Sequence, residues 1–410
     1  MRRALRSFLA TRHPNSAVTT LFNAYRVLAN RDKATRWRVR DMLRAHRALR
    51  RSGNRIVFFD WHPSHYEFTR PLVEEVSKHE PVVWIVAASG HPALLPGNRP
   101  DRTEVICTDG SLVLNFLRAR LLVTPASHIR RERLPLGGEA VHTYHSLVSM
   151  HVVYEEFAFD AFTHFLAAGP HHVEELRSIA AHRGWNSYHA HEVGYPKVDA
   201  LAQLYRTEAA TDDAGDKVSR TILLAPSWHK SSLLRASSLA IVQTLIDSGH
   251  RVIVRPHPLS YDVDKDAMRM LLQLAEEQPD MCVVEGRSPD LSSMAKADVM
   301  ISDWSGVAYE FAFGTERPVI FVDVPQKINS KDWQAHTVPA MEDVLRRQVG
   351  VVVDDYDSIL SGLAEISKTS PAEWQKRIRE VRASHLFNFG TSAQAGARVL
   401  RELAGGNPGS

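Results

Sequence analysis

Short apolar runs alternate with amphipathic segments along most of the chain, and the runs fall into two series. Strands buried in a parallel sheet are short and continuously apolar, whereas the helices between them follow a 3.6-residue period. The alternation therefore predicts an α/β fold with two mostly parallel sheets. The first series of predicted strands covers residues 54–60, 81–88, 105–108, 121–124, 165–169 and 192–196. The second covers residues 221–225, 251–255, 281–285, 299–302, 319–323 and 350–354. We expect helices near residues 69–78, 238–248, 266–277 and 290–297, from residue 305 onward, and over 391–403.

A polar and acidic stretch separates the two series. Residues 207–220 (TEAATDDAGDKVSR) contain no apolar run, which is typical of a linker. We expect one Rossmann-like domain over 51–206 and another over 221–385, then a C-terminal helical region over 386–404 and a disordered tail over 405–410. Ligands of open α/β sheets lie beyond the carboxyl ends of the strands. The pattern thus predicts a binding cleft between two domains.

The N-terminal region, residues 1–50, has its own charge pattern. It holds thirteen Arg and Lys residues against Asp32 and Asp41, and its apolar residues fall at helical spacings. A basic amphipathic helix binds an anionic membrane surface, and a basic face packed on a neighbouring domain gives the same pattern. Both interpretations stay open. The net charge of the whole chain is only +3, and no known nucleic-acid motif occurs, so a nucleic-acid partner is not expected.

Cysteine use and hydropathy indicate the compartment. Cys107 and Cys282 are isolated, which argues against a disulfide framework or a cysteine zinc site and fits a reducing cytoplasm. No run has the apolar length of a membrane span, and no secretory pattern opens the chain. We expect a cytoplasmic protein, peripheral at the inner face of the plasma membrane if residues 1–50 bind lipid.

Two segments follow apolar strands of the second series and carry phosphate-binding chemistry. In Asp303-Trp304-Ser305-Gly306 a small polar turn precedes a helix, whose free N–H groups and dipole attract phosphate. Asp303 or Ser305 could instead only cap that helix. In Arg255-Pro256-His257-Pro258 the prolines fix the loop, so that Arg255 and His257 could neutralise a diphosphate. A rigid turn with an ordinary histidine is the alternative.

A third segment, His142-Thr143-Tyr144-His145-Ser146-Leu147, lies in the first series. A histidine in a cleft can act as a general base near neutral pH. Because the chain has 21 histidines, each one is more often an ordinary core or surface residue. The pairs His171/His172 and His189/His191 lack carboxylates at zinc spacing. We therefore expect no metal site.

The order of these segments resembles that of the CDP-glycerol glycerophosphotransferase family, the enzymes of teichoic-acid and capsule polymer synthesis. The resemblance runs from His142 to Phe321. It is carried by His142–Leu147, Val193–Asp199, Leu224–Trp228, Arg255–Pro258 and Asp298–Phe313. It implies the GT-B fold, in which two Rossmann-like domains flank a cleft, here with a basic helical N-terminal extension. His145 resembles the catalytic histidine of the family, and His257 resembles its second essential histidine.

The resemblance also assigns the donor side. Asp303 and Ser305 match the acidic residue and the first serine of the donor-phosphate loop, and Glu310 matches an acidic residue on the following helix. Three positions depart from the family pattern. Tyr144-His145-Ser146 replaces Trp-His-Gly, Gly306 replaces the second serine, and His229-Lys230 replaces an arginine. Arg255 and Gly306 complete the expected phosphate site, with Ser227 and Lys230 as additional candidates.

The implied function is transfer of glycerol phosphate or ribitol phosphate from a CDP-activated donor to a hydroxyl of a cell-surface glycan, polymer or lipid-linked acceptor, with no cofactor required. We expect His145 to face Arg255, His257 and Ser305 across the cleft. Two alternatives stay open: a GT-B glycosyltransferase that uses a CMP- or UDP-sugar, and a non-catalytic GT-B binding module. The loop also resembles the Asp-Ser-Gly-Gly loop of UDP-GlcNAc 2-epimerases, but the inserted Trp304 argues against that enzyme.

Overall fold

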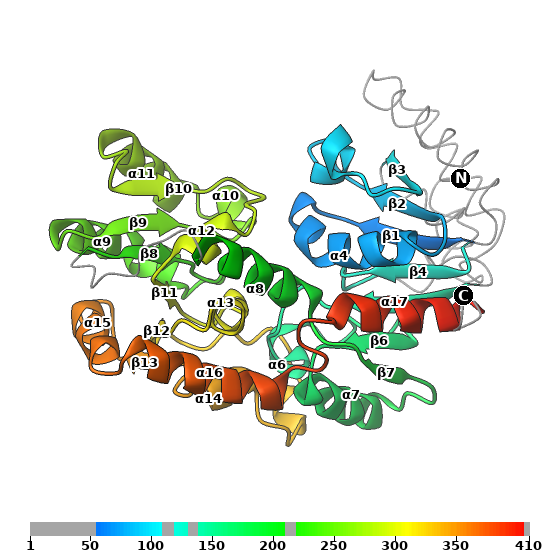
Figure 1. The fold of residues 1–410 in the computed structure, drawn as a ribbon. Coiled ribbons are helices and arrows are strands. Elements are labelled where there is room, and N and C mark those ends of the chain that lie inside the picture. Colours follow the sequence, from blue (N-terminus) through cyan, green and yellow to red (C-terminus); the bar gives the residue numbers. More distant parts are fainter. Residues whose placement is uncertain (1–54, 109–118, 130–137, 210–218, 406–410) are drawn as a thin grey trace, which may run out of the picture. The chain divides into compact units, whose positions relative to one another are not determined.

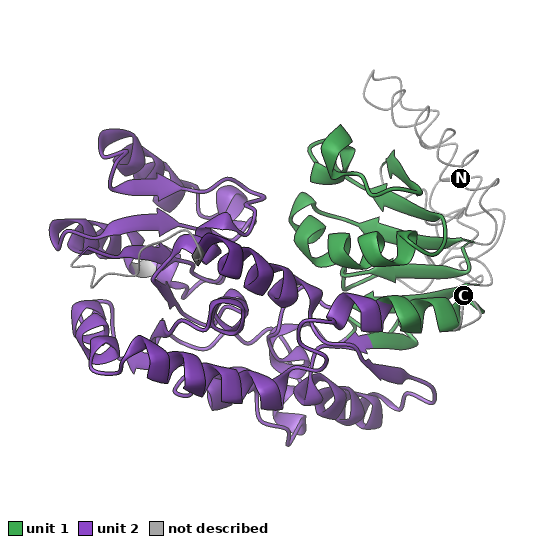
Figure 2. Cartoon of the chain, in the orientation of Figure 1, with its two compact units in different colours: residues 1–143, 157–165, 397–410 green, residues 144–156, 166–396 purple. Residues whose placement is uncertain are grey.

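The computed structural model describes residues 55–108, 119–129, 138–209 and 219–405 (Figure 1). The predicted basic region 1–50 lies outside these residues, as do most of the linker and of the tail. By its internal contacts the chain divides into two compact units (Figure 2). Unit 1 contains residues 1–143, 157–165 and 397–410, and unit 2 contains residues 144–156 and 166–396. Unit 2 therefore includes His145, which the sequence assigned to the first domain. The domain boundaries themselves stay a prediction.

The first sheet has the strand order β3-β2-β1-β4-β5-β6-β7, and the pairings from β3 to β5 are parallel. Strands β1, β2 and β4 are buried along their whole length, as a strand covered on both faces must be. The strands are β1 Ile56–Asp60, β2 Val82–Val86, β3 Thr103–Cys107, β4 Leu121–Thr124, β5 Glu139–Thr143, β6 His164–Ala167 and β7 His189–Glu192. The chain also forms the helices α4 Tyr66–Ser77, α6 Met150–Val153, α7 Pro170–Arg183 and α17 Ser392–Leu403, with short 3-10 turns at Pro63–His65, Pro92–Leu94 and Pro96–Asn98.

The second sheet has the order β10-β9-β8-β11-β12-β13, and all its pairings are parallel. Its chain order reverses between β8 and β11, which makes that point the expected ligand site of a doubly wound sheet. The strands are β8 Thr221–Leu224, β9 Arg251–Val254, β10 Cys282–Val284, β11 Val299–Ser302, β12 Val319–Val322 and β13 Gly350–Val353.

The helices of unit 2 connect these strands. They are α8 Pro196–Ala209, α9 Leu233–Asp247, α10 Ser260–Val263, α11 Lys265–Glu277, α12 Ser292–Lys296, α13 Val307–Thr315, α14 Met341–Leu345, α15 Ile359–Ser367 and α16 Pro371–His385, with a 3-10 turn at Trp333–Ala335. Helix α13 is buried over most of its surface and packs against α8. A capping box of Ser370 and Glu373 starts α16.

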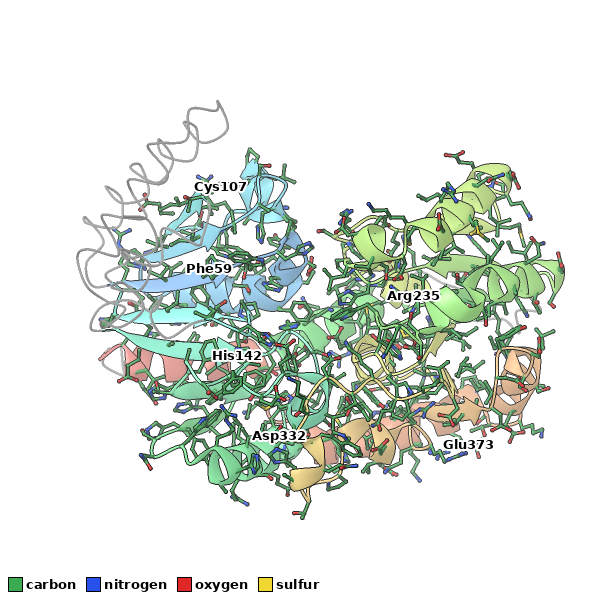
Figure 3. All side chains as sticks on the ribbon, turned by 180° about the vertical axis from the view of Figure 1, so that it is seen from behind. Phe59, Cys107, His142, Arg235, Asp332 and Glu373 are labelled. Carbon is green, nitrogen blue, oxygen red and sulfur yellow. The ribbon has the colours of Figure 1, made fainter. Side chains whose placement is uncertain are left out.

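Two strands of the first sheet differ from the prediction. The predicted strand over 192–196 was wrong, since β7 covers His189–Glu192, and β5 was missed. Both carry polar residues that break an apolar run. In β5, His142, which is labelled in Figure 3, is fully buried. Its ring contacts those of Phe159 and Phe162, so it is a core residue of unit 1. Among the described residues, no helix combines the length and the apolar character that crossing a bilayer requires.

Candidate active site

Asp303 organises the switch point of the second sheet. It follows β11 directly and is only 1% exposed. One carboxylate oxygen accepts the N–H of Ser227, at 2.7 Å, and the other accepts the N–H of Leu233, the first residue of α9, at 3.0 Å. Asp303 thus fixes the loop after β8 and caps α9, so its carboxylate serves a helix other than the one that follows it in sequence.

The N-terminus of α13 begins with a residue that has no side chain. Gly306 is its N-cap residue and so makes no side-chain cap hydrogen bond of its own. Both oxygens of Asp303 bind N–H groups outside α13, whereas a cap of this helix by Ser305 stays a prediction. The first N–H groups of a helix lack intrahelical acceptors and carry the positive end of the helix dipole. Ser305 stands beside this turn, half-buried, so the turn has the chemistry of a phosphate site.

The segment after β5 meets this helix end. A methyl group at Gly306 would overlap Oγ of Ser146 and lie 3.2 Å from both the Leu147 nitrogen and Cγ1 of Val148. Only glycine allows so close an approach. The His145-Ser146 segment therefore lies against the turn of Ser305 and Gly306, within unit 2, although the two segments are far apart in sequence.

His145 is half-buried and oriented by Tyr154. The two rings meet edge to face with centroids 5.8 Å apart, and Nε2 of His145 lies 3.4 Å from the Tyr154 hydroxyl. Burial raises the pKa of Tyr154 well above its usual value, so that hydroxyl keeps its proton. The imidazole thus has an ordered ring position, on the residue that precedes the one meeting Gly306.

Two buried carboxylates hold Ser149 and Met150, which follow shortly after the His145-Ser146 segment. Glu342 accepts the N–H of Ser149 at 2.9 Å and its hydroxyl at 2.6 Å, and Glu175 accepts the N–H of Met150 at 2.6 Å. Burial raises the pKa of Glu342 to about 7. No local sequence motif marks either carboxylate, because their partners lie in segments distant in the chain.

Arg255 and His257 lie at the carboxyl end of β9 in different surroundings. The Arg255 guanidinium is buried, donating to the Glu285 carboxylate at 3.1 Å and to Oγ of Ser293 at 2.9 Å. His257 is half-buried, with its ring centroid 5.6 Å from that of Trp228. Its Nδ1 accepts the N–H of Leu259 at 3.2 Å, which places the proton of a neutral ring on Nε2.

The remaining candidates divide between the loop after β8 and helix α13. Oγ of Ser227 lies 3.0 Å from Nδ1 of His229, and Lys230 is exposed in the turn before α9. Glu310, on α13, is buried and accepts from the Tyr195 hydroxyl at 2.8 Å and from the Lys197 ammonium at 2.6 Å. These contacts connect the first turn of α13 to the start of α8.

Within the described ranges, no three or more His, Cys, Asp and Glu side chains are grouped so that they could hold a metal ion. In the pair His171/His172, the side chain of His171 is buried, and this burial lowers its pKa to about 3. Its ring is therefore neutral at physiological pH.

The approach of Ser146 to Gly306 yields a paired test. We expect Gly306→Ala to lower kcat/KM by about 10- to 100-fold, because displacement of a site by about 1 Å has effects of that size. Ser146→Gly in the same chain removes the overlapping Oγ and should restore most of the loss. Kinetics of both single variants and of the double variant measure the coupling. Purely additive effects would show that the two positions do not meet.

A family model described as CDP-Glycerol:Poly(glycerophosphate) glycerophosphotransferase matches residues 42–404. A solved structure of a variant of the wall teichoic acid polymerase TagF with CDPG aligns at 16% identity with a TM-score of 0.60, covering 95% of this chain and 98% of that one. A co-structure of S. aureus MnaA with UDP aligns at 10% identity with a TM-score of 0.52, covering 85% and 96%. No curated protein matches by sequence. At these identities the structures show the fold alone, and they confirm the predicted α/β fold of GT-B type.

Proposed function

Because the chain belongs to the CDP-glycerol:poly(glycerophosphate) glycerophosphotransferase family, we propose that it transfers glycerol phosphate from CDP-glycerol to a hydroxyl group of a glycan, polymer or lipid-linked acceptor. The predicted family and the predicted enzyme class are confirmed. The active site of this proposal is the turn of Ser305 and Gly306 together with His145. The observation that supports it most is the close approach of Ser146 to Gly306, since it sets the residue after His145 beside the N-terminus of α13.

The donor diphosphate binds at the N-terminus of α13 in this proposal. The backbone N–H groups of the turn and the Ser305 hydroxyl donate to its oxygens, and His257 neutralises charge on the nucleotide side. Asp303 acts through the backbone, because both of its oxygens hold neighbouring N–H groups. Arg255 supports the site through Glu285, just after β10, and Ser293 of α12, and Glu310 supports it through its contacts at the start of α8.

His145 is the general base. It removes the proton from the acceptor hydroxyl as that oxygen attacks the phosphorus bonded to glycerol. A new P–O bond forms, the bond to the bridging oxygen of the diphosphate breaks, and CMP leaves with that oxygen. A positioned base supplies about 10²- to 10⁴-fold in rate. Stabilisation of the charge that develops on CMP is the task of the donor-side groups.

The cellular location is part of the same proposal. We propose that the protein works in the cytoplasm and that residues 1–50, with thirteen basic residues, bring it to the inner face of the plasma membrane. Co-sedimentation of the full chain with anionic and with neutral vesicles distinguishes this role from that of a basic face packed on a neighbouring domain.

A ligand panel tests the donor. We expect CDP-glycerol to raise the Tm more than CDP-ribitol, CMP-sugars or UDP-sugars, because a ligand at about 100 times its Kd stabilises the folded state by about 2.7 kcal/mol. Incubation with acceptor should then release CMP and incorporate glycerol phosphate. CMP and glycerol phosphate, each added alone, are the controls. Stabilisation by a nucleotide sugar together with sugar transfer would favour the glycosyltransferase, and a lack of response to every nucleotide would favour a binding module.

A further inference from the structure

Lys327 is a buried cation that the sequence analysis did not single out. It lies in the loop between β12 and α14 and is only 9% exposed. Its ammonium lies 4.6 Å from the centroid of the Trp228 ring, in a cation–π contact. Burial lowers the pKa of Lys327 to about 8, against the opposing effect of the Asp303 and Glu342 carboxylates. The ammonium is therefore charged at neutral pH, in a place where a charge is costly.

The loop that carries Lys327 is fixed to three other segments of unit 2. The Trp304 indole donates to the Val324 carbonyl at 2.7 Å, and Nε2 of His229 lies 3.1 Å from the Pro325 carbonyl. On the other side of Lys327, the Asn329 N–H donates to the Val152 carbonyl at 3.0 Å. The lysine is thus held in place by the loop after β8, the loop after β11 and the helix after the His145 segment.

The carboxylates near Lys327 are occupied by other donors. Asp303 binds the backbone at Ser227 and Leu233, and Glu342 binds Ser149. Among the residues that the structure describes, none of the ion pairs within 4.0 Å involves Lys327. A buried ammonium whose charge is balanced only by an aromatic ring and by more distant carboxylates is suited to an anionic ligand.

Trp228 also contacts His257, so one indole ring carries two groups that can be cationic. From this arrangement we propose that Lys327 binds the diphosphate of the donor, together with His257 and the N-terminus of α13. The inference rests on the proposed function and deepens it, because it adds a charged phosphate ligand that no local motif marks. Charge-assisted bonds to phosphate are stronger than neutral ones, which explains why a costly buried lysine is placed here.

Removal of the charge tests the proposal. We expect Lys327→Met to weaken CDP-glycerol binding by about 10- to 100-fold, as loss of a hydrogen bond to a charged group does. Lys327→Arg should keep part of the affinity. The Tm of the free Lys327→Met protein should equal or exceed that of the wild type, because the variant has lost a buried charge. A structural cation–π contact alone would instead lower the Tm and leave ligand affinity unchanged.

The pH dependence adds a readout specific to the ammonium. Wild-type affinity for CDP-glycerol should fall as the pH rises through about 8, because the lysine then loses its proton. The profile of Lys327→Met should be flat over that range. Asp303, Glu342, His229 and His257 also face this region, and burial raises the pKa of Glu342 to about 7, so only the difference between the wild-type and Lys327→Met profiles is assigned to the lysine. Lys331→Met is the matched control, since it removes the same charge from an exposed lysine of the same loop.

Calorimetry with inorganic pyrophosphate and with cytidine separates this inference from the proposed function. Pyrophosphate should bind the wild type and the Lys331→Met variant but bind Lys327→Met at least tenfold more weakly, whereas cytidine should bind all three equally. Equal pyrophosphate affinity in all three proteins would overturn the role of Lys327. If the wild type bound pyrophosphate through Lys327 but did not bind CDP-glycerol, the proposed donor would be wrong. The proposed phosphate site would then still stand.

Discussion

His145→Ala is expected to lower kcat for glycerol-phosphate transfer by about 10²- to 10⁴-fold, the contribution of a positioned general base. The Kd for CDP-glycerol should change little, because the groups proposed to bind the donor lie on the turn of Ser305 and Gly306. The imidazole itself is only half-buried and contacts Tyr154 at the edge of the ring. Loss of the side chain should therefore leave the fold intact, so that the effect falls on the chemical step. Initial rates at saturating donor, together with calorimetric Kd values, measure the two quantities separately.

The matched control for this variant is His79→Ala, which removes an exposed imidazole in unit 1. Its kcat should equal that of the wild type. His145→Gln adds a second comparison, because it keeps a polar side chain but cannot accept a full proton. Wild-type turnover in His145→Ala would remove the base from the mechanism, and an equal loss of donor affinity and kcat would move His145 to donor binding.

Local patterns predicted most of the fold. Strands β4 and β11 begin and end where the apolar runs LLVT and VMIS do, because a strand buried on both faces needs apolar residues throughout. The same rule fails where a strand carries polar residues. His142 of β5 is buried among aromatic rings, and β7 reads HAHE, so neither strand shows an apolar run.

The candidate site could be predicted only in part. The motifs around His257 and Ser305 stand out in the sequence because small, rigid or polar residues follow apolar strands there, whereas His145 follows the missed strand β5 and was identified through the family resemblance. Their mutual placement is a tertiary property, and the approach of Ser146 to Gly306 has no local signal. For the same reason Lys327 and Glu342 were missed, since each gains its role from partners more than ninety positions away or in another loop.

Buried carboxylates connect the parts of this site. Asp303 joins the loop after β11 to the loop after β8, Glu342 joins α14 to the His145 segment, and Glu310 joins α13 to the start of α8. A buried carboxylate is costly unless it is fully hydrogen-bonded, so each one is stable only when the two segments meet. Such contacts fix loop positions more tightly than apolar packing does, which is what a phosphate site built from backbone N–H groups requires.

Among these carboxylates, the largest loss of stability on substitution is expected at Glu310. Glu310→Ala should destabilise the protein by about 3–5 kcal/mol, because it leaves the Lys197 ammonium buried without the carboxylate that lies 2.6 Å away. In a unit of this size the Tm should fall by roughly 10 °C, at about 2–4 °C per kcal/mol. Glu310→Gln keeps an acceptor for the Tyr195 hydroxyl and should lose less. The double variant Glu310→Met with Lys197→Met should recover most of the stability, since it leaves no buried charge. Thermal unfolding of the four proteins measures the series.

Asp266→Ala, which breaks an ion pair that is exposed on both sides, is the control and should leave the Tm nearly unchanged. A wild-type Tm for Glu310→Ala would show that the pair does not join α13 to α8.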